Sequence, residues 1–179
     1  HIPEEDSVAL DLKMRMANTG PRQQVRIGVV RLPHISNYTD FDSLEQEPSV
    51  NLFYFTTPAE VFDLDLVILP GSKNPLHDLH YLHNQGLADA IISFHEKGGN
   101  VVGICGGYQM LGRRVLDPLG VESDFKETAG LNLLNMETEL LGEKVTTQVK
   151  ARMLWDKLTD PEEQLHGYEI HMGRSKVLG

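Results

Sequence analysis

The chain has 179 residues, of which 40% are hydrophobic and 23% are charged, a composition typical of a globular domain with a full core. Its net charge is −10, and the absence of a basic face argues against nucleic acid or an anionic lipid surface as a partner. No apolar run is long enough to span a bilayer, and the first residues lack the apolar stretch of a secretory signal. The single cysteine cannot form a disulfide within the chain, which favours a cytoplasmic location.

Residues 1–24 are predicted to form a linker between domains. The segment opens with a proline and a charge run and closes on a Thr-Gly-Pro sequence, and Val8 and Leu12 have helical spacing within it. We therefore expect a connector with one short helix, followed by a folded domain over residues 25–179.

Short apolar strands alternate with helices in the first half of this domain. Buried strands are predicted at 25–32, 51–55, 64–69 and 100–105. Helical spacing of apolar residues predicts helices over 74–84 and 87–94. Continuous apolar strands that alternate with helices are typical of an α/β fold with a mainly parallel sheet flanked by helices.

The second half of the chain has a different pattern. Apolar and β-branched residues predict strands at 131–141 and 143–149, joined at the sequence Leu-Gly-Glu, and a short strand at 167–172. We therefore expect additional antiparallel strands late in the chain.

The run VVGICGGYQMLG, residues 101–112, places Cys105 between a strand-like and a helix-like stretch. The pattern G-x-C-x-G is typical of a nucleophile elbow, because glycines permit a sharp turn and the close approach of a reacting carbonyl. A lone cysteine is also often a small buried hydrophobe, and similar turns bind phosphate. The elbow alone leaves these alternatives open.

The sequence PGSKN, residues 70–74, follows the strand predicted at 64–69 and opens a helix. Ligands of open α/β sheets bind at the carboxyl ends of the strands, where free backbone N–H groups of this loop could hold an oxyanion. A plain turn with a capping serine or asparagine explains the same residues.

Several segments in order resemble one branch of the class I (triad-type) glutamine amidotransferases, which have a flavodoxin-like fold. The branch is the C-terminal glutaminase domain of the cobyric acid synthase family. The segments that carry the resemblance are RLPHISNYTDFD (31–42), LPGSKNP (69–75), GICGGYQMLG (103–112), GLNLL (130–134) and GYEIHMG (167–173). The resemblance covers nearly all of residues 25–173, and the first ten residues resemble the connector of that family.

This resemblance implies an activity and a set of site residues. Cys105 would attack the side-chain amide of L-glutamine, with His171 as general base and acid. Backbone N–H groups of Gly106 and of the Gly71 loop would form the oxyanion hole, and Gln109 would help to hold the substrate. No metal or cofactor is expected in this domain.

The resemblance also implies a partner. ATP and Mg²⁺ are expected only at an N-terminal synthetase domain of the same polypeptide. There the ammonia would amidate carboxylates of adenosylcobyrinic acid a,c-diamide, a corrinoid. The chain lacks the P-loop sequence G-x-x-x-x-G-K-[ST], so we do not expect it to bind ATP through that motif. It also stops soon after GYEIHMG, which predicts a C-terminal truncation relative to the family, and we expect only weak activity of the isolated domain.

The sequence departs from the triad pattern at the histidine. Triad amidotransferases usually read H-x-E, whereas this chain reads His171-Met172-Gly173. Glu169 lies two residues before the histidine and would share a strand face with it, so it could orient the imidazole. It could equally face solvent or a domain interface.

Other interpretations stay open. The chain could belong to a cobyrinic acid a,c-diamide synthase or another ligase-linked amidotransferase, or it could be an inactive regulatory domain or cysteine hydrolase of the same fold. His77, His80 and His83 are spaced by three, but that spacing drifts around a helix and no carboxylate ligands accompany it, which favours a polar helix face over a metal site. Trp155 is predicted to lie in the core or an interface.

Overall fold

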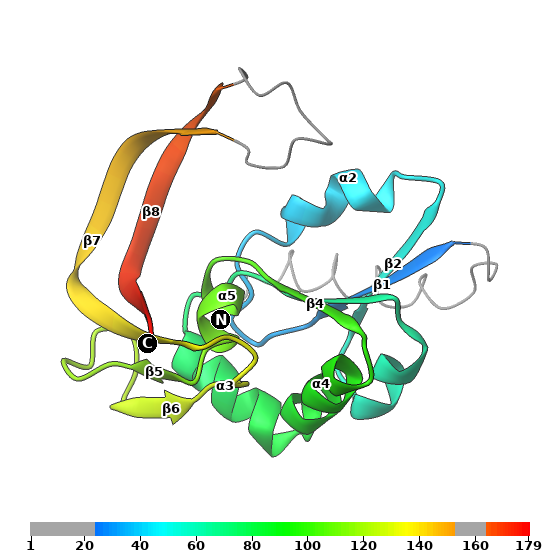
Figure 1. Ribbon diagram of the computed structural model, residues 1–179, viewed down its shortest axis with the longest axis horizontal. Coiled ribbons are helices and arrows are strands. Elements are labelled where there is room, and N and C mark those ends of the chain that lie inside the picture. Colours follow the sequence, from blue (N-terminus) through cyan, green and yellow to red (C-terminus); the bar gives the residue numbers. More distant parts are fainter. Residues whose placement is uncertain (1–23, 153–163) are drawn as a thin grey trace.

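The computed structural model describes residues 24–152 and 164–179. The predicted linker, apart from its last residue, and Trp155 lie outside the described residues. Within the described ranges, no helix has the length and apolar character needed to cross a membrane. The strands of the described residues form two four-stranded sheets, and helices lie beside the first of them (Figure 1).

The first sheet is parallel, with strand order β2-β1-β3-β4. Its strands are β1 Val25–Val30, β2 Val50–Phe55, β3 Leu66–Leu69 and β4 Asn100–Gly103. The four predicted strands and their parallel arrangement are therefore confirmed. Leu32 and Ile104 continue past the carboxyl ends of β1 and β4 as loops, so these two strands are shorter than predicted.

Helices cover both faces of the parallel sheet. The connection from β1 to β2 contains η1 Tyr38–Phe41 and α2 Asp42–Glu45, and η2 Pro58–Asp63 precedes β3. The connection from β3 to β4 contains α3 Pro75–Asn84 and α4 Leu87–Glu96, as predicted. Figure 1 shows α2 on one side of the sheet and α3 and α4 on the other, as right-handed crossovers to opposite edges require.

The amphipathic pattern of α3 explains its place in the core. Asn74 caps its start by accepting a hydrogen bond from the backbone N–H of His77, and Pro75 occupies the first turn, where its missing donor costs nothing. Leu76, Leu79 and Leu82 are fully buried. Their spacing puts them on one helix face, against the sheet.

The second sheet is mixed, with strand order β6-β5-β7-β8. Its strands are β5 Arg114–Leu116, β6 Glu127–Ala129, β7 Met136–Arg152 and β8 Gln164–Val177. β5 pairs parallel with β7, while β6 and β8 pair antiparallel with β5 and β7 respectively. The predicted late antiparallel strands are confirmed. The sequence did not predict β5 and β6, because a strand of three residues is too short to show an alternating apolar pattern.

The prediction of two strands at 131–141 and 143–149 is wrong in its details. Residues 131–135 form a loop, and β7 runs as one strand through the supposed joint. β8 pairs with β7 on both sides of that joint, so the Leu-Gly-Glu sequence becomes an irregularity between Leu140 and Val145 instead of a reversal. The strands β7 and β8 together form a long ribbon that leaves the body of the molecule (Figure 1).

Candidate active site

Cys105 occupies a sharp turn between β4 and α5 Gly106–Met110. Its φ of 49° and ψ of −109° lie outside the regions that L-residues normally adopt, and its side chain is exposed. A Cβ at Gly107 would collide with the backbone oxygen of Leu69, and one at Gly103 would lie 2.6 Å from the oxygen of Gly107. The glycines therefore let strand and helix pack closely enough to present the thiol, as in a nucleophile elbow.

The loop after β3 lies directly beside this turn. A Cβ built on Gly106 would lie 2.9 Å from the backbone nitrogen of Ser72, and one on Gly71 would lie 3.9 Å from the Cβ of Cys105. Because Gly106 is the first residue of α5, its N–H has no acceptor within the helix. The carboxyl ends of β3 and β4 thus bring backbone donors close to the thiol.

Asp78 holds this loop in place from the buried face of α3. Its carboxylate is fully buried and accepts hydrogen bonds from Ser72 Oγ at 2.6 Å and from the backbone N–H of His34 at 3.2 Å. His34 Nδ1 also lies 2.8 Å from it. Burial raises the pKa of Asp78, and the hydrogen bonds from Ser72 and His34 oppose that rise.

The sequence analysis did not single out Asp78. A signal was present, since Asp78 precedes Leu82 by four residues and therefore lies on the apolar face of the helix. A carboxylate in that position needs partners.

His171 lies on β8 with both ring nitrogens in contact with acceptors. Nε2 is 2.7 Å from Oε1 of Glu169, and Nδ1 is 2.6 Å from the backbone oxygen of Gly173. Glu169 therefore contacts His171, which is one of the alternatives that the sequence analysis left open. Among the contacts that the structure describes around this ring, none joins His171 to Cys105.

Gly173 lies against the helix that follows the cysteine. A Cβ at this position would lie 2.5 Å from Nε2 of Gln109 and 2.8 Å from Cγ2 of Thr138. Gln109 is almost fully buried. A glutamate at the third position of the H-x-E pattern would therefore require the side chains of Gln109 and Thr138 to move.

These residues line one cavity of about 530 Å³ between the elbow and the ribbon. Its lining consists of Cys105, Tyr108, Gln109, Glu169, Ile170, His171, Gly173, Arg174 and Ser175. The structure thus brings Cys105, Gln109 and His171 together, with Gly71 and Gly106 beside the cysteine but outside the lining. The sequence analysis missed Arg174, which also lines this cavity.

The histidines of α3 have protein partners. His80 stacks on Phe125 with ring centroids 3.8 Å apart, His77 lies 4.9 Å from the same ring, and His83 Nε2 is 2.9 Å from the backbone oxygen of Ala129. Burial, and then the neighbouring histidines, lower the pKa of His80. Within the described ranges, no three His, Cys, Asp or Glu residues are placed to hold a metal ion.

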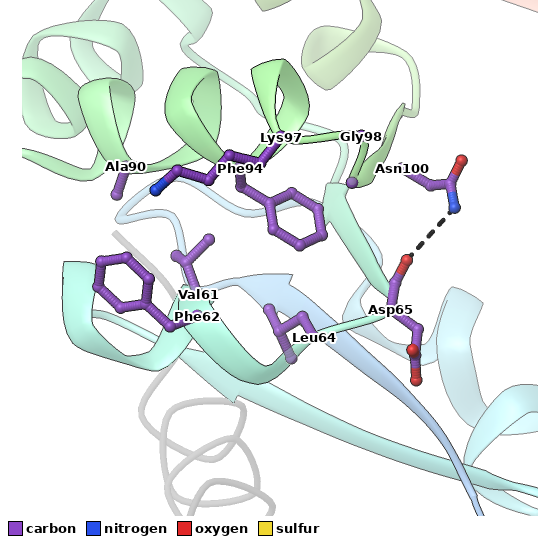
Figure 2. A pocket seen from close by; sticks show the side chains of 10 residues that line it. Val61, Phe62, Leu64, Asp65, Ala90, Phe94, Lys97, Gly98 and Asn100 are labelled. Carbon is purple, nitrogen blue, oxygen red and sulfur yellow. Dashed lines mark hydrogen bonds between the residues drawn. The ribbon is translucent and has the colours of Figure 1, made fainter.

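A second cavity, of about 380 Å³, opens at the amino ends of β3 and β4 (Figure 2). Phe62 and Phe94 line it, the ammonium group of Lys97 lies 5.7 Å from the Phe62 ring centroid, and Asn100 Nδ2 donates to the backbone oxygen of Asp65 at 3.5 Å. Cys105 follows the opposite end of β4. The candidate chemistry therefore belongs to the carboxyl edge of the sheet, as in other open α/β folds.

Residues 26–179 match the family of the CobB/CobQ-like glutamine amidotransferase domain. The chain belongs to this family. Like this chain, two solved structures have the amidotransferase fold. One is described as a crystal structure of glutamine amidotransferase (TM-score 0.62, 16% identity, 86% of this chain and 75% of that chain). The other is PurLQS from Thermotoga maritima (TM-score 0.61, 17% identity, 87% of this chain and 71% of that chain). The predicted fold class is confirmed.

Relatives of this CobB/CobQ-like domain include cobyric acid synthases. The one from Syntrophobacter fumaroxidans is 55% identical over 99% of this chain and 35% of the relative. The one from Desulfitobacterium hafniense is 49% identical over 99% of this chain and 36% of the relative. The chain thus spans about a third of the length of these relatives.

Proposed function

We propose that this chain is the glutaminase domain of a cobyric acid synthase, with Cys105 as nucleophile and His171 as general base and acid. The observation that carries the proposal is the strained elbow of Cys105, which shares one cavity with His171 and Gln109. Strained backbone at an exposed thiol is typical of a functional site.

In the first half of the reaction, Sγ of Cys105 attacks the side-chain amide carbon of glutamine. The thiol proton passes to His171, and the carbonyl oxygen becomes an oxyanion near the N–H groups of Gly106 and the Gly71 loop. His171 then returns the proton to the amide nitrogen as the carbon–nitrogen bond breaks. Ammonia leaves, and a γ-glutamyl thioester remains on Cys105.

In the second half, water attacks the thioester carbon while His171 accepts its proton. The carbon–sulfur bond breaks, glutamate leaves, and the thiol of Cys105 is restored. Gln109 packs against Gly173 on the cavity wall, where its amide can hold the substrate. The positive charge of Arg174 suits the α-carboxylate of glutamine.

The proposed partner is the remainder of a longer polypeptide. Relatives named cobyric acid synthase are about three times as long as this chain, and a synthetase domain in the other part would use ATP, Mg²⁺ and the ammonia to amidate carboxylates of adenosylcobyrinic acid a,c-diamide. A net charge of −10 disfavours binding of a polycarboxylate corrinoid to this domain, which supports amidation in the other part of the polypeptide. The relatives' names favour this function over a cobyrinic acid a,c-diamide synthase.

The test is release of ammonia and glutamate from L-glutamine by the purified chain and its Cys105→Ala variant. We expect activity in the first and none above background in the second, because the variant has no nucleophile. Leu119→Ala, which alters an exposed side chain, is the matched control and should retain activity. A glutamine-like electrophile should label Cys105, with protection by glutamine. Equal activity of the Cys105→Ala variant, or labelling that glutamine does not reduce, would refute the proposal.

A further inference from the structure

Each ring nitrogen of His171 faces a hydrogen-bond acceptor, but the neutral ring has only one hydrogen to donate. A neutral imidazole carries one ring hydrogen, and both the Glu169 carboxylate at 2.7 Å and the Gly173 carbonyl at 2.6 Å only accept. A hydrogen bond to a carboxylate is the stronger of the two because it is charge-assisted. In the neutral ring the hydrogen therefore resides on Nε2, and the lone pair of Nδ1 faces a carbonyl oxygen that repels it.

We propose that Glu169 is a positioning residue that fixes the orientation and the tautomer of the His171 ring, with the ring hydrogen of the neutral form on Nε2. The ring lines the same cavity as Cys105. When the ring is protonated, both nitrogens carry hydrogen, and the Glu169 carboxylate and the Gly173 carbonyl both lie at hydrogen-bond distance to accept from them.

The packing around Gly173 favours a carboxylate at position 169. A Cβ at position 173 would lie within 3 Å of Gln109 and Thr138, so a glutamate there would require these side chains to move. Glu169 and His171 lie on the same face of the strand, opposite Thr147 and Val145 of β7. The carboxylate that orients the ring thus precedes the histidine in the sequence instead of following it.

The ion pair between Glu169 and His171 contributes little to the stability of the fold. The side chain of Glu169 is 52% exposed and that of His171 is 32% exposed, and ion pairs with such exposure contribute about 0–1 kcal/mol. Glu169→Gln should therefore fold normally, which permits a clean test of its role in positioning.

The experiment compares Glu169→Gln with Glu139→Gln in the full chain. Glu139 is an exposed carboxylate on β7, and its substitution changes the net charge equally. We expect kcat for glutamine hydrolysis to fall about 10- to 100-fold in Glu169→Gln, part of the 10²–10⁴-fold that general acid–base catalysis supplies. KM should be unchanged, and Glu139→Gln should behave as the unmodified chain.

The second measurement is ¹⁵N NMR of the His171 ring at mildly alkaline pH. We expect the hydrogen on Nε2 in the unmodified chain and in Glu139→Gln, and mixed tautomers in Glu169→Gln. An unchanged kcat in Glu169→Gln, or an unchanged tautomer, would overturn the inference. The inference rests on the proposed function for its kinetic part. If the unmodified chain hydrolyses no glutamine, that function fails, whereas the tautomer still decides whether Glu169 positions the ring.

Discussion

Gly173 occupies the position at which triad amidotransferases usually carry the glutamate of the H-x-E sequence. The space that its side chain would need is taken by the amide of Gln109 and the methyl group of Thr138. Its backbone oxygen is also the acceptor for Nδ1 of His171. Gly173 on β8, the strand of His171, therefore packs directly against Gln109 on α5, the helix that follows Cys105.

We expect Gly173→Ala to reduce both stability and glutamine hydrolysis. The added methyl group must displace Gln109 or β8, and overpacking of this kind costs about 1–3 kcal/mol. Urea unfolding and the kinetics of ammonia release measure the two effects. Gly167→Ala on the same strand is the control, since a Cβ there has no neighbour within 4 Å. Equal behaviour of the two variants would contradict the packing argument.

At the scale of elements, α3 supports the candidate site through Asp78. The helix buries its leucines against the sheet and turns one carboxylate toward two loops, so that Ser72 and His34 are both held by the same side chain. The loop beside Cys105 is thereby fixed to the rigid core, which a site built on loops requires.

We expect the stability of the chain to depend on pH through Asp78. Burial raises its pKa in the folded state above the ordinary 3.8, so the unfolded chain loses this proton first as pH rises. The contribution of Asp78 is complete below pH 3.8 and is lost as pH rises through the folded-state pKa. Asp78→Asn removes this dependence and should therefore cost less free energy of unfolding near neutral pH than near pH 3.8.

Urea unfolding of the chain and of Asp78→Asn at both pH values measures that difference. Asp89→Asn alters an exposed carboxylate of α4 and serves as the control. An identical loss of stability for Asp78→Asn at the two pH values would show that burial does not govern this group.

At the scale of the whole molecule, the core and the ribbon are distinct in their exposure. The apolar side chains of the parallel sheet and its helices are buried, and the buried residues reach the second sheet only at its base, as at Val115 and Leu140. Beyond Val145 the ribbon exposes large apolar side chains, including Tyr168 at 72%. The candidate site lies where these two parts meet.

We expect the exposed apolar side chains of the described ribbon to contribute little to folding. Tyr168→Ser replaces one of them, on β8. The free energy of unfolding should change by less than about 1 kcal/mol, because surface changes seldom cost more. Leu140→Ala at the buried base is the contrasting variant and should cost about 2–5 kcal/mol. A loss as large for Tyr168→Ser as for Leu140→Ala would contradict this division between the ribbon and the core.

The sequence by itself determined the α/β class, the four parallel strands, α3 and α4, and the elbow at Cys105. These features follow from apolar spacing and from glycines next to one residue, and such patterns depend on near neighbours in the chain. The resemblance added His171, Gln109 and the loop at Gly71 as candidates, and the structure places them around one turn or one cavity.

Only the tertiary structure decided how those candidates meet. It made β7 one strand because β8 pairs along both halves, gave Asp78 its partners, and filled the space beside position 173 with the side chain of Gln109. It also placed Glu169 on the ring of His171. The physical reason is that available space, burial and strand pairing are set by segments far apart in the sequence, which no local pattern records.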